Sequence, residues 1–434
     1  MTPPSLSRRG LLTGVAALAF PSLIGNRAVA MNQLSANALE MLKNTMEAHV
    51  AEGRMAGATW LLRHDAVEHV GTAGTFALNG EGAPMARDTI FRVASLTKPV
   101  TAAVAMMLVE DGVLTLDGSV DDLLPELADR RVLKSLDGPL DETVPANRSV
   151  TLRQLLTMTF GLGAIMVFPE AYPIQKAMRE AGIAPSWVLP KMPSDAYMKK
   201  LGALPLAAQP GEAFFYNNGF DVAGILIERA TGQRLGTVME ERLFAPLGMK
   251  DTGFHVSVKK QDRLPKQYGP DFANGGRELI AFGSEQGVDF TSTPPMDSGA
   301  GGMVSTLDDY ASFCCMMLYG GTLGGRRYLK AETVAEMTRD QLTPAQKMAP
   351  HATMFMDEGG AGWGLGMSVG LRRTRPWLTP GNFGWNGGFG TTAYTDPQNG
   401  LVGIFLSQSM MASPEPPQTY VDFWKGAYRA IGAA

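Results

Sequence analysis

Residues that this sequence contains in small numbers exclude several kinds of chemistry. Its 434 residues include only two cysteines, Cys314 and Cys315, which are neighbours in the chain. Adjacent cysteines rarely close a disulfide, because the short loop strains the backbone. We therefore expect two free, buried thiols on a helix. The five histidines are scattered, and no group of cysteine and histidine has the spacing of zinc ligands. The sequence predicts neither a disulfide framework nor a metal site.

The chain also lacks an excess of charge of one sign. Charged residues make up 18% of the sequence, the net charge is −4, and no long run of lysine and arginine occurs. A nucleic-acid-binding surface needs clustered positive charge, so the composition argues against such a partner. The apolar share of 45% is that of an ordinary globular protein. The length allows one to three domains.

Long apolar runs are missing beyond the first thirty residues, which form a segment of their own. Residues 7–12 read Ser-Arg-Arg-Gly-Leu-Leu, and an apolar stretch and the small residues 28–30 follow. This order is typical of a twin-arginine export signal, and an N-terminal helix of the fold is the alternative. A membrane anchor is disfavoured, because the apolar run is shorter than ~18 residues and contains Pro21. We expect residues 1–30 to be removed and the mature protein to be periplasmic or secreted.

Apolar periodicity predicts the regular elements outside the middle of the chain. Helical spacing predicts four helices, at 34–50, 101–110, about 305–318 and 419–431. Short apolar runs predict five strands, at 58–63, 67–71, 362–369, 389–395 and 401–407. The first two strands are separated by His64-Asp65-Ala66 and should form a hairpin.

The middle of the chain has a different composition from the two ends. From about residue 113 to 289 it is rich in leucine, methionine, alanine and proline, which favours helices and long loops. The order hairpin, helices, strands, helix predicts one α/β (α+β) domain, residues 31–434. In that domain 31–112 and 290–434 would form an α/β lobe, and 113–289 a helical insertion lobe. The sequence contains no internal repeat.

A candidate nucleophile lies where an apolar run meets the start of a helix. Ser95 and Lys98 are three residues apart and therefore share one face of that helix. A serine hydroxyl needs an adjacent base, and a lysine can be that base when burial lowers its pKa. Free amides at a helix start also stabilise an oxyanion. A second Ser-x-x-Lys, Ser257 to Lys260, lies in a polar stretch and is interpreted as a solvated loop.

Two further motifs strengthen the case for Ser95. Tyr216-Asn217-Asn218 is the only Tyr-x-Asn in the chain, and a phenol close to an ammonium can act as a second base. Near the C-terminus, the glycine-rich segment 384–388 (Gly-Trp-Asn-Gly-Gly) precedes a predicted strand. Glycines there let a backbone N–H approach a substrate carbonyl closely.

The order of these motifs resembles the serine β-lactamase and penicillin-binding-protein superfamily, and Tyr-x-Asn is similar to the class C β-lactamases and family VIII carboxylesterases. The resemblance implies an antiparallel sheet flanked by helices, with a helical insertion lobe. It implies an acyl-enzyme on Ser95, with Lys98 and Tyr216 sharing the base and acid roles. Asn218 would position Lys98 or the substrate, and the amides of Ser95 and Gly388 would form the oxyanion hole. No cofactor is implied.

The sequence departs from the lactamase pattern at two places. Trp385-Asn386-Gly387 stands where β-lactamases carry Lys-Thr-Gly, so no cation is present to hold a substrate carboxylate. A tryptophan there resembles the esterase branch, and Trp385, Gly387 and Gly388 become candidate substrate-binding residues. Residues 158–161, Met-Thr-Phe-Gly, are more apolar than the His-Thr-Ser-Gly of relatives. Both differences favour a neutral, hydrophobic acyl group.

These observations lead to a hypothesis with two alternatives. The sequence predicts a serine hydrolase, a carboxylesterase that acts on small or medium neutral acyl esters, with a small acyl molecule as its partner and no stable membrane insertion. A D,D-peptidase or class C-like β-lactamase is the alternative within enzymes. A catalytically idle homologue that only binds a ligand is the alternative of another class. The complete set Ser95, Lys98 and Tyr216 argues against idleness.

One more serine matches a known pattern but lacks its context. Gly366-Met367-Ser368-Val369-Gly370 has the form of a nucleophile elbow, which needs a strand, a sharp turn and a helix. The residues after it include Arg372, Arg373, Arg375 and Pro376, which cannot begin a clean helix, and no histidine follows Ser368. We interpret Ser368 as an incidental serine in a strand.

Overall fold

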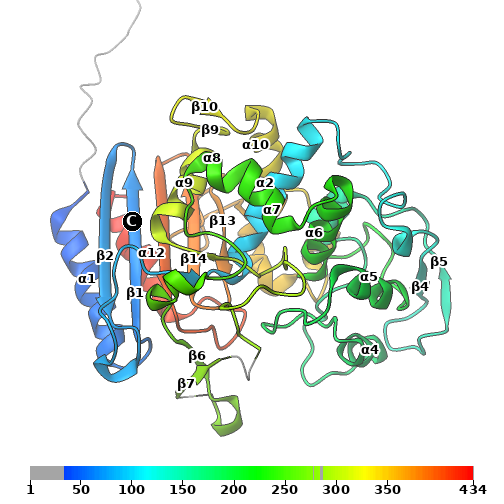
Figure 1. The fold of residues 1–434 in the computed structure, drawn as a ribbon, viewed down its shortest axis with the longest axis horizontal. Coiled ribbons are helices and arrows are strands. Elements are labelled where there is room, and N and C mark those ends of the chain that lie inside the picture. Colours follow the sequence, from blue (N-terminus) through cyan, green and yellow to red (C-terminus); the bar gives the residue numbers. More distant parts are fainter. Residues whose placement is uncertain (1–33, 277, 284–286, 434) are drawn as a thin grey trace, which may run out of the picture.

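A computed structural model describes residues 34–276, 278–283 and 287–433 (Figure 1). The predicted export signal, residues 1–30, lies outside the described residues. Among those described, no helix is both long and apolar enough to cross a membrane.

Seven antiparallel strands form the central sheet, and they come from both ends of the chain. Their order is β11-β12-β13-β14-β15-β1-β2. The bounds are β1 Gly57–His64, β2 Val67–Gly74, β11 Ala361–Trp363, β12 Ser368–Gly370, β13 Phe383–Gly387, β14 Thr391–Asp396 and β15 Leu401–Ser407. The two chain ends join where β1 pairs with β15, with Trp60 opposite Phe405. The predicted mixed fold with a large antiparallel sheet and flanking helices is confirmed.

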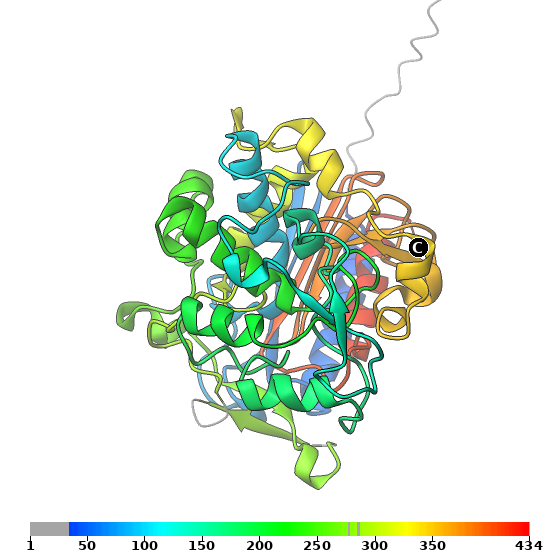
Figure 2. The same cartoon turned by 90° about the vertical axis from the view of Figure 1, so that its right-hand side faces the viewer.

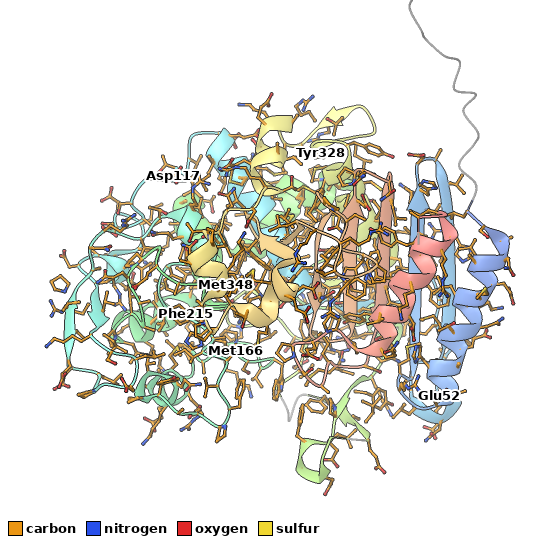
Figure 3. The ribbon with its side chains drawn as sticks, turned by 180° about the vertical axis from the view of Figure 1, so that it is seen from behind. Glu52, Asp117, Met166, Phe215, Tyr328 and Met348 are labelled. Atoms are coloured by element: carbon orange, nitrogen blue, oxygen red, sulfur yellow. The ribbon has the colours of Figure 1, made fainter. Side chains whose placement is uncertain are left out.

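Helices cover both faces of this sheet. Successive residues of a strand point to opposite faces, so apolar side chains on both faces can pack against helices. Trp60 and Leu62 pack under α1 (Ala36–Ala51) and α12 (Gln418–Ala430), which lie side by side in front of the strands in Figure 3. Leu61, between them in β1, belongs to the larger core on the other face. That core contains α2 (Thr97–Glu110) and α9 (Leu307–Leu318).

A lobe of helices and long loops lies beyond α2 and faces the viewer in Figure 2. Its helices are α3 Leu152–Leu156, α4 Pro173–Ala181, α5 Ser194–Gly202 and α6 Asn218–Thr231. The chain continues with α7 Leu235–Met239, which contacts α2, and α8 Ala245–Leu247, which contacts α9. Short strand pairs are β3 Phe91–Arg92 with β8 Val304–Ser305, β4 Arg131–Leu133 with β5 Thr143–Pro145, β6 Gln267–Pro270 with β7 Leu279–Phe282, and β9 Thr322–Leu323 with β10 Arg326–Arg327. The remaining helices are α10 Ala331–Met337 and α11 Pro344–Met348. The longest of the lobe's helices, α6, packs against α2 and α3.

One predicted strand differs from what is found, and one strand was not predicted. The run predicted as one strand, 362–369, is a hairpin of β11 and β12, and Gly366 in its turn has a φ of 91°. Its continuous apolar character hid that turn. The glycine-rich motif at 384–388 precedes a strand, β14, as predicted, but most of it also forms a strand that was not predicted, β13, paired with β14. Its glycines lower its strand propensity, and the pairing with β14 compensates.

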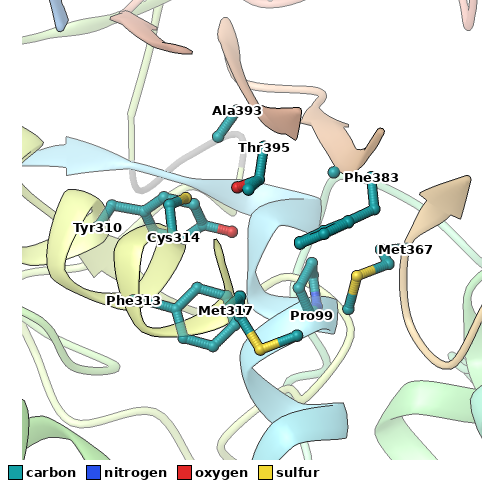
Figure 4. Close-up of a pocket in the computed structure, with 10 residues that line it drawn as sticks. Pro99, Tyr310, Phe313, Cys314, Met317, Met367, Phe383, Ala393 and Thr395 are labelled. Carbon is teal, nitrogen blue, oxygen red and sulfur yellow. The ribbon is translucent and has the colours of Figure 1, made fainter. Parts of the chain in front are cut away.

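The start of α2 is supported from behind by apolar side chains. Pro99 lies in a small, largely apolar pocket between α2, α9 and the sheet, together with Tyr310, Cys314 and Phe383 (Figure 4). Tyr310 Oη donates a 2.9 Å hydrogen bond to the carbonyl oxygen of Leu96. This bond fixes the backbone one residue after Ser95. Both cysteines lie on α9, buried and free, as the sequence predicts.

Candidate active site

A tight turn presents Ser95 at the beginning of α2. The turn is the 3₁₀ helix η2 (Ala94–Leu96), which joins strand β3 to α2. Ala94 has a φ of 46°, a left-handed conformation that is costly for a residue other than glycine and is often found at functional sites. Thr97 Oγ1 holds the turn by donating to the carbonyl oxygen of Ala94 at 2.7 Å. The amide of Ser95 belongs to the first turn, where amides lack an intrahelical acceptor.

The amine of Lys98 lies at the centre of the site. Its Nζ donates to Ser95 Oγ at 2.9 Å, to Asn217 Oδ1 at 2.8 Å and to the carbonyl oxygen of Ala300 at 2.6 Å. It also lies 4.5 Å from the centroid of the Tyr216 ring. The side chain is completely buried, and burial lowers the pKa of Lys98 to about 7 against the opposing charge of Asp221. An amine with such a pKa can accept the proton of Ser95 near neutral pH.

The hydroxyl of Tyr216 is held by Trp385. Trp385 Nε1 donates to Tyr216 Oη at 2.7 Å. Burial raises the pKa of Tyr216 to about 12, and hydrogen bonds with Ser95 and Trp385 oppose that increase. At neutral pH Tyr216 is therefore a phenol, suited to donating a proton. An indole N–H can only donate, so Trp385 stabilises the phenolate when it forms.

Aromatic rings surround this pair. Phe355 stacks on Tyr216 with centroids 4.6 Å apart, and Trp363 lies perpendicular to Trp385 at 4.7 Å. Because the only donor of Trp385 is engaged by Tyr216, this side chain has no N–H left to offer to a substrate. This side of the site is therefore apolar.

The glycine-rich strand β13 ends beside the nucleophile. A Cβ at Gly387 would lie 2.3 Å from the carbonyl oxygen of Val93, so only glycine allows this approach. Thr391 Oγ1 donates to the same oxygen at 3.1 Å, and Tyr420 Oη donates to the carbonyl oxygen of Gly387 at 3.0 Å. The end of β13 lies against η2. An oxyanion hole formed by the amides of Ser95 and Gly388 fits this arrangement and stays a prediction.

The asparagine that contacts Lys98 is not the one that the sequence predicted. The amide that accepts from Lys98 is that of Asn217, whereas Asn218 Nδ2 donates to the carbonyl oxygen of Ile183 and to Tyr197 Oη. The reason is the backbone of Asn217, whose φ of 87° turns the chain before α6 begins at Asn218. Asn218 is 1% exposed and faces the interior of the helical lobe.

Sequence reasoning also missed Asp221 and the segment 298–300. Asp221 is the single acidic residue in the first half of α6, where it is followed by a run of apolar residues, and it is buried. A carboxylate on such a helix face is the signal that could have marked it. Segment 298–300, by contrast, contributes the backbone carbonyl oxygen of Ala300, and no pattern of side chains predicts a backbone contact.

The two other candidate serines lie elsewhere. Ser368 is the first residue of β12, 2% exposed, and the next element after β12 is a strand, β13, and not a helix. Ser257 is an exposed residue before a short 3₁₀ helix (Val258–Arg263), and Lys260 pairs with Asp251 at 2.8 Å. Neither of them therefore has a buried lysine as its partner.

Comparison with known proteins places this geometry in a family. The model of the β-lactamase family matches residues 42–421. The chain belongs to the β-lactamase family. The predicted superfamily and the assignment as a serine hydrolase are thereby confirmed.

Several relatives within the family carry names that describe ester chemistry. The chain is 28% identical to the lovastatin esterase of Penicillium rubens over 85% of this chain and 93% of that protein. It is 29% identical to esterase EstB of Burkholderia gladioli over 85% and 90%. An uncharacterized protein of Mycobacterium tuberculosis is 36% identical over 75% of this chain and 79% of its own.

Solved structures agree on the fold. EstCE1, described as a hydrolase with promiscuous acyltransferase activity, superposes with a TM-score of 0.75 at 23% identity, over 90% of this chain and 98% of the other. A mutant of simvastatin synthase from Aspergillus terreus gives 0.73 at 25% identity, over 92% and 96%.

Replacement of the nucleophile is the first test. We expect Ser95→Ala to abolish turnover, because no other candidate serine contacts a buried lysine. A fluorophosphonate probe should label the peptide that contains Ser95 and no other. Ser368→Ala is the matched control and should retain nearly full activity. Loss of activity in folded Ser368→Ala, with labelling at that residue, would assign the nucleophile to β12 instead.

Proposed function

We propose that this protein is a carboxylesterase that forms an acyl-enzyme on Ser95 and hydrolyses small or medium neutral acyl esters. The proposal rests on Trp385, which stands where β-lactamases carry the lysine of Lys-Thr-Gly. Trp385 donates its only N–H to Tyr216 and supplies no cation for a substrate carboxylate. The names of the Penicillium and Burkholderia relatives support ester hydrolysis as the reaction.

The contacts of the site assign a role to each group in such a reaction. Lys98 accepts the proton of Ser95, whose Oγ attacks the ester carbonyl and forms a tetrahedral oxyanion. The amides of Ser95 and Gly388 would stabilise that oxyanion. Tyr216 then donates its proton to the departing alkoxide, and the phenolate is held by Trp385. Lys98 returns the proton to the phenolate, and water releases the acyl group by the reverse sequence.

The apolar surroundings favour a neutral substrate. A carboxylate placed against Phe355, the half-buried ring of this cluster, would lose its hydration without gaining an ionic partner, which is unfavourable. A neutral acyl or alkoxy group loses little hydration and gains contact with the rings. The site therefore discriminates against the charged substrates of β-lactamases and D,D-peptidases.

The charge at residue 385 gives the second prediction. Wild type should have a much higher kcat/KM for a p-nitrophenyl ester than for nitrocefin. Trp385→Lys should narrow that gap, because a charge-assisted bond to a carboxylate contributes roughly 1.5–3 kcal/mol, or about one to two decades in affinity. Trp385→Phe is the matched control, which keeps a ring and adds no charge. It should lower ester turnover without improving nitrocefin hydrolysis.

The same kinetic comparison tests the alternatives. If wild type hydrolyses nitrocefin as fast as the ester, the lactamase hypothesis replaces the esterase. Preferential cleavage of a D-Ala-D-Ala peptide would favour the peptidase. Labelling of Ser95 without turnover of any of the three substrates would favour the idle homologue.

We also propose that the protein is exported by the twin-arginine route. The support is the sequence of residues 7–30 alone, with Arg8 and Arg9 as the pair that an export receptor reads. We expect the Arg8→Lys, Arg9→Lys double variant to accumulate as precursor in the cytoplasm, whereas wild type is cleaved within a few residues of Met31. Fractionation with N-terminal sequencing measures both. Equal export of the double variant would contradict the proposal.

A further inference from the structure

A second buried charge lies behind the catalytic lysine. Asp221, on α6, is 4% exposed. Its Oδ1 accepts hydrogen bonds from Ser298 Oγ at 2.6 Å and from the amide of Ala300 at 3.3 Å. No ion pair of Asp221 within 4 Å occurs among the residues that the structure describes. Burying a carboxylate without a close cation is costly, so its presence in the core needs an explanation.

The residue that connects Asp221 to the active site is Ala300. Its amide donates to Asp221, and its carbonyl oxygen accepts the 2.6 Å bond from Lys98 Nζ. The backbone of one residue therefore lies between the two buried charges. A change in the position or charge of Asp221 acts directly on the group that holds the amine.

The segment 298–300 has little freedom to rearrange. Thr101 Oγ1 of α2 donates to the carbonyl oxygen of Gly299 at 2.9 Å. A Cβ at Gly299 would lie 2.5 Å from the carbonyl oxygen of Phe220, so the segment packs directly on the backbone of α6. The segment thus lies between α2 and α6, with Asp221 holding it from one side and Lys98 from the other.

We propose that Asp221 is a positioning residue of this active site, which holds the Ala300 peptide against Lys98 and balances the charge of the buried ammonium. The inference rests on the proposed function only in taking Lys98 as the base for Ser95. It assigns to Asp221 no contact with the substrate.

Few other charged groups lie where they could balance the buried ammonium of Lys98. Tyr216 faces Lys98, and its side chain is uncharged at neutral pH. On α2 the only other charged residue is Glu110, at the far end, and β13 contains none. On α6, Glu228 accepts a hydrogen bond from Ser194 Oγ, and Arg229 forms ion pairs with Glu126 and Asp195. In the neighbouring segment, Asp297 pairs with Arg234.

The charge of Asp221 determines the direction in which its removal shifts the pKa of Lys98. The negative charge of Asp221 favours the protonated amine and so raises the pKa of Lys98, while burial lowers it. Removal of that charge should lower the pKa of Lys98 further, so that the neutral base is available at lower pH. The acidic limb of the rate profile of Ser95 should therefore move to lower pH.

The test uses the pH dependence of fluorophosphonate labelling of Ser95 in the full chain. Asp221→Asn keeps the size of the side chain and an oxygen acceptor but removes the charge. We expect its acidic limb to lie about one pH unit below that of wild type. The matched control is Asp297→Asn, a buried carboxylate of the same loop whose partner is Arg234. Its limb should coincide with that of wild type. An unmoved limb in Asp221→Asn, or an equal movement in both variants, overturns the proposal.

A second variant keeps the test usable if Asp221→Asn does not fold. Ser298→Ala removes one of the two hydrogen bonds that stabilise the Asp221 carboxylate, and thereby favours its neutral form. The limb should move in the same direction by a smaller amount, and a limb unchanged in folded Ser298→Ala contradicts the proposal. Labelling does not require ester turnover. Failure of the esterase hypothesis, seen as labelling without hydrolysis, is therefore distinct from failure of this one.

Discussion

The burial of one amine determines most of this active site. Lys98 Nζ is enclosed by Ser95 from the turn before α2, Asn217 from the loop before α6, and Ala300 from the segment that precedes β8. An ammonium can donate to all three acceptors, whereas burial disfavours its charge. Burial lowers the pKa of Lys98 to about 7, against the opposing charge of Asp221. Because Asn217 and Ala300 lie far from Lys98 in the sequence, the amine has all its partners only when these distant segments are packed together.

The contrast between Lys98 and Tyr216 separates the two proton-transfer roles. Burial disfavours the ammonium of Lys98 and the phenolate of half-buried Tyr216, so their pKa values are about 7 and about 12. Lys98 is therefore the better base toward Ser95, and Tyr216 the better acid toward a leaving alkoxide. In this chain the donor that contacts the Tyr216 hydroxyl, and would stabilise its phenolate, is an indole N–H. Because residue 385 is a tryptophan and not a lysine, the Trp385-Asn386-Gly387 motif offers no cation to an anionic substrate.

Local spacing predicted some of this site, and tertiary packing formed the rest. Ser95 and Lys98 lie three residues apart on one helix face, and their contact at 2.9 Å follows from that spacing. The bond between Trp385 and Tyr216 joins residues 169 positions apart, and nothing in either motif announces it. The choice between Asn217 and Asn218 depends on a left-handed φ that an asparagine tolerates but does not require. The sheet was predictable in outline from its apolar runs. Its β11–β12 turn was not, because the residues there are apolar on both sides.

The central claim is that Lys98 is a base poised near neutral pH, and NMR tests it most directly. Protein labelled with ¹³Cε-lysine would be titrated, and the resonance of Lys98 assigned by its loss in Lys98→Arg. The account predicts that this resonance titrates with a pKa of about 7, well apart from the remaining lysines. A Lys98 resonance that titrates near the ordinary lysine value of 10.5 would contradict it and would leave Ser95 without its base.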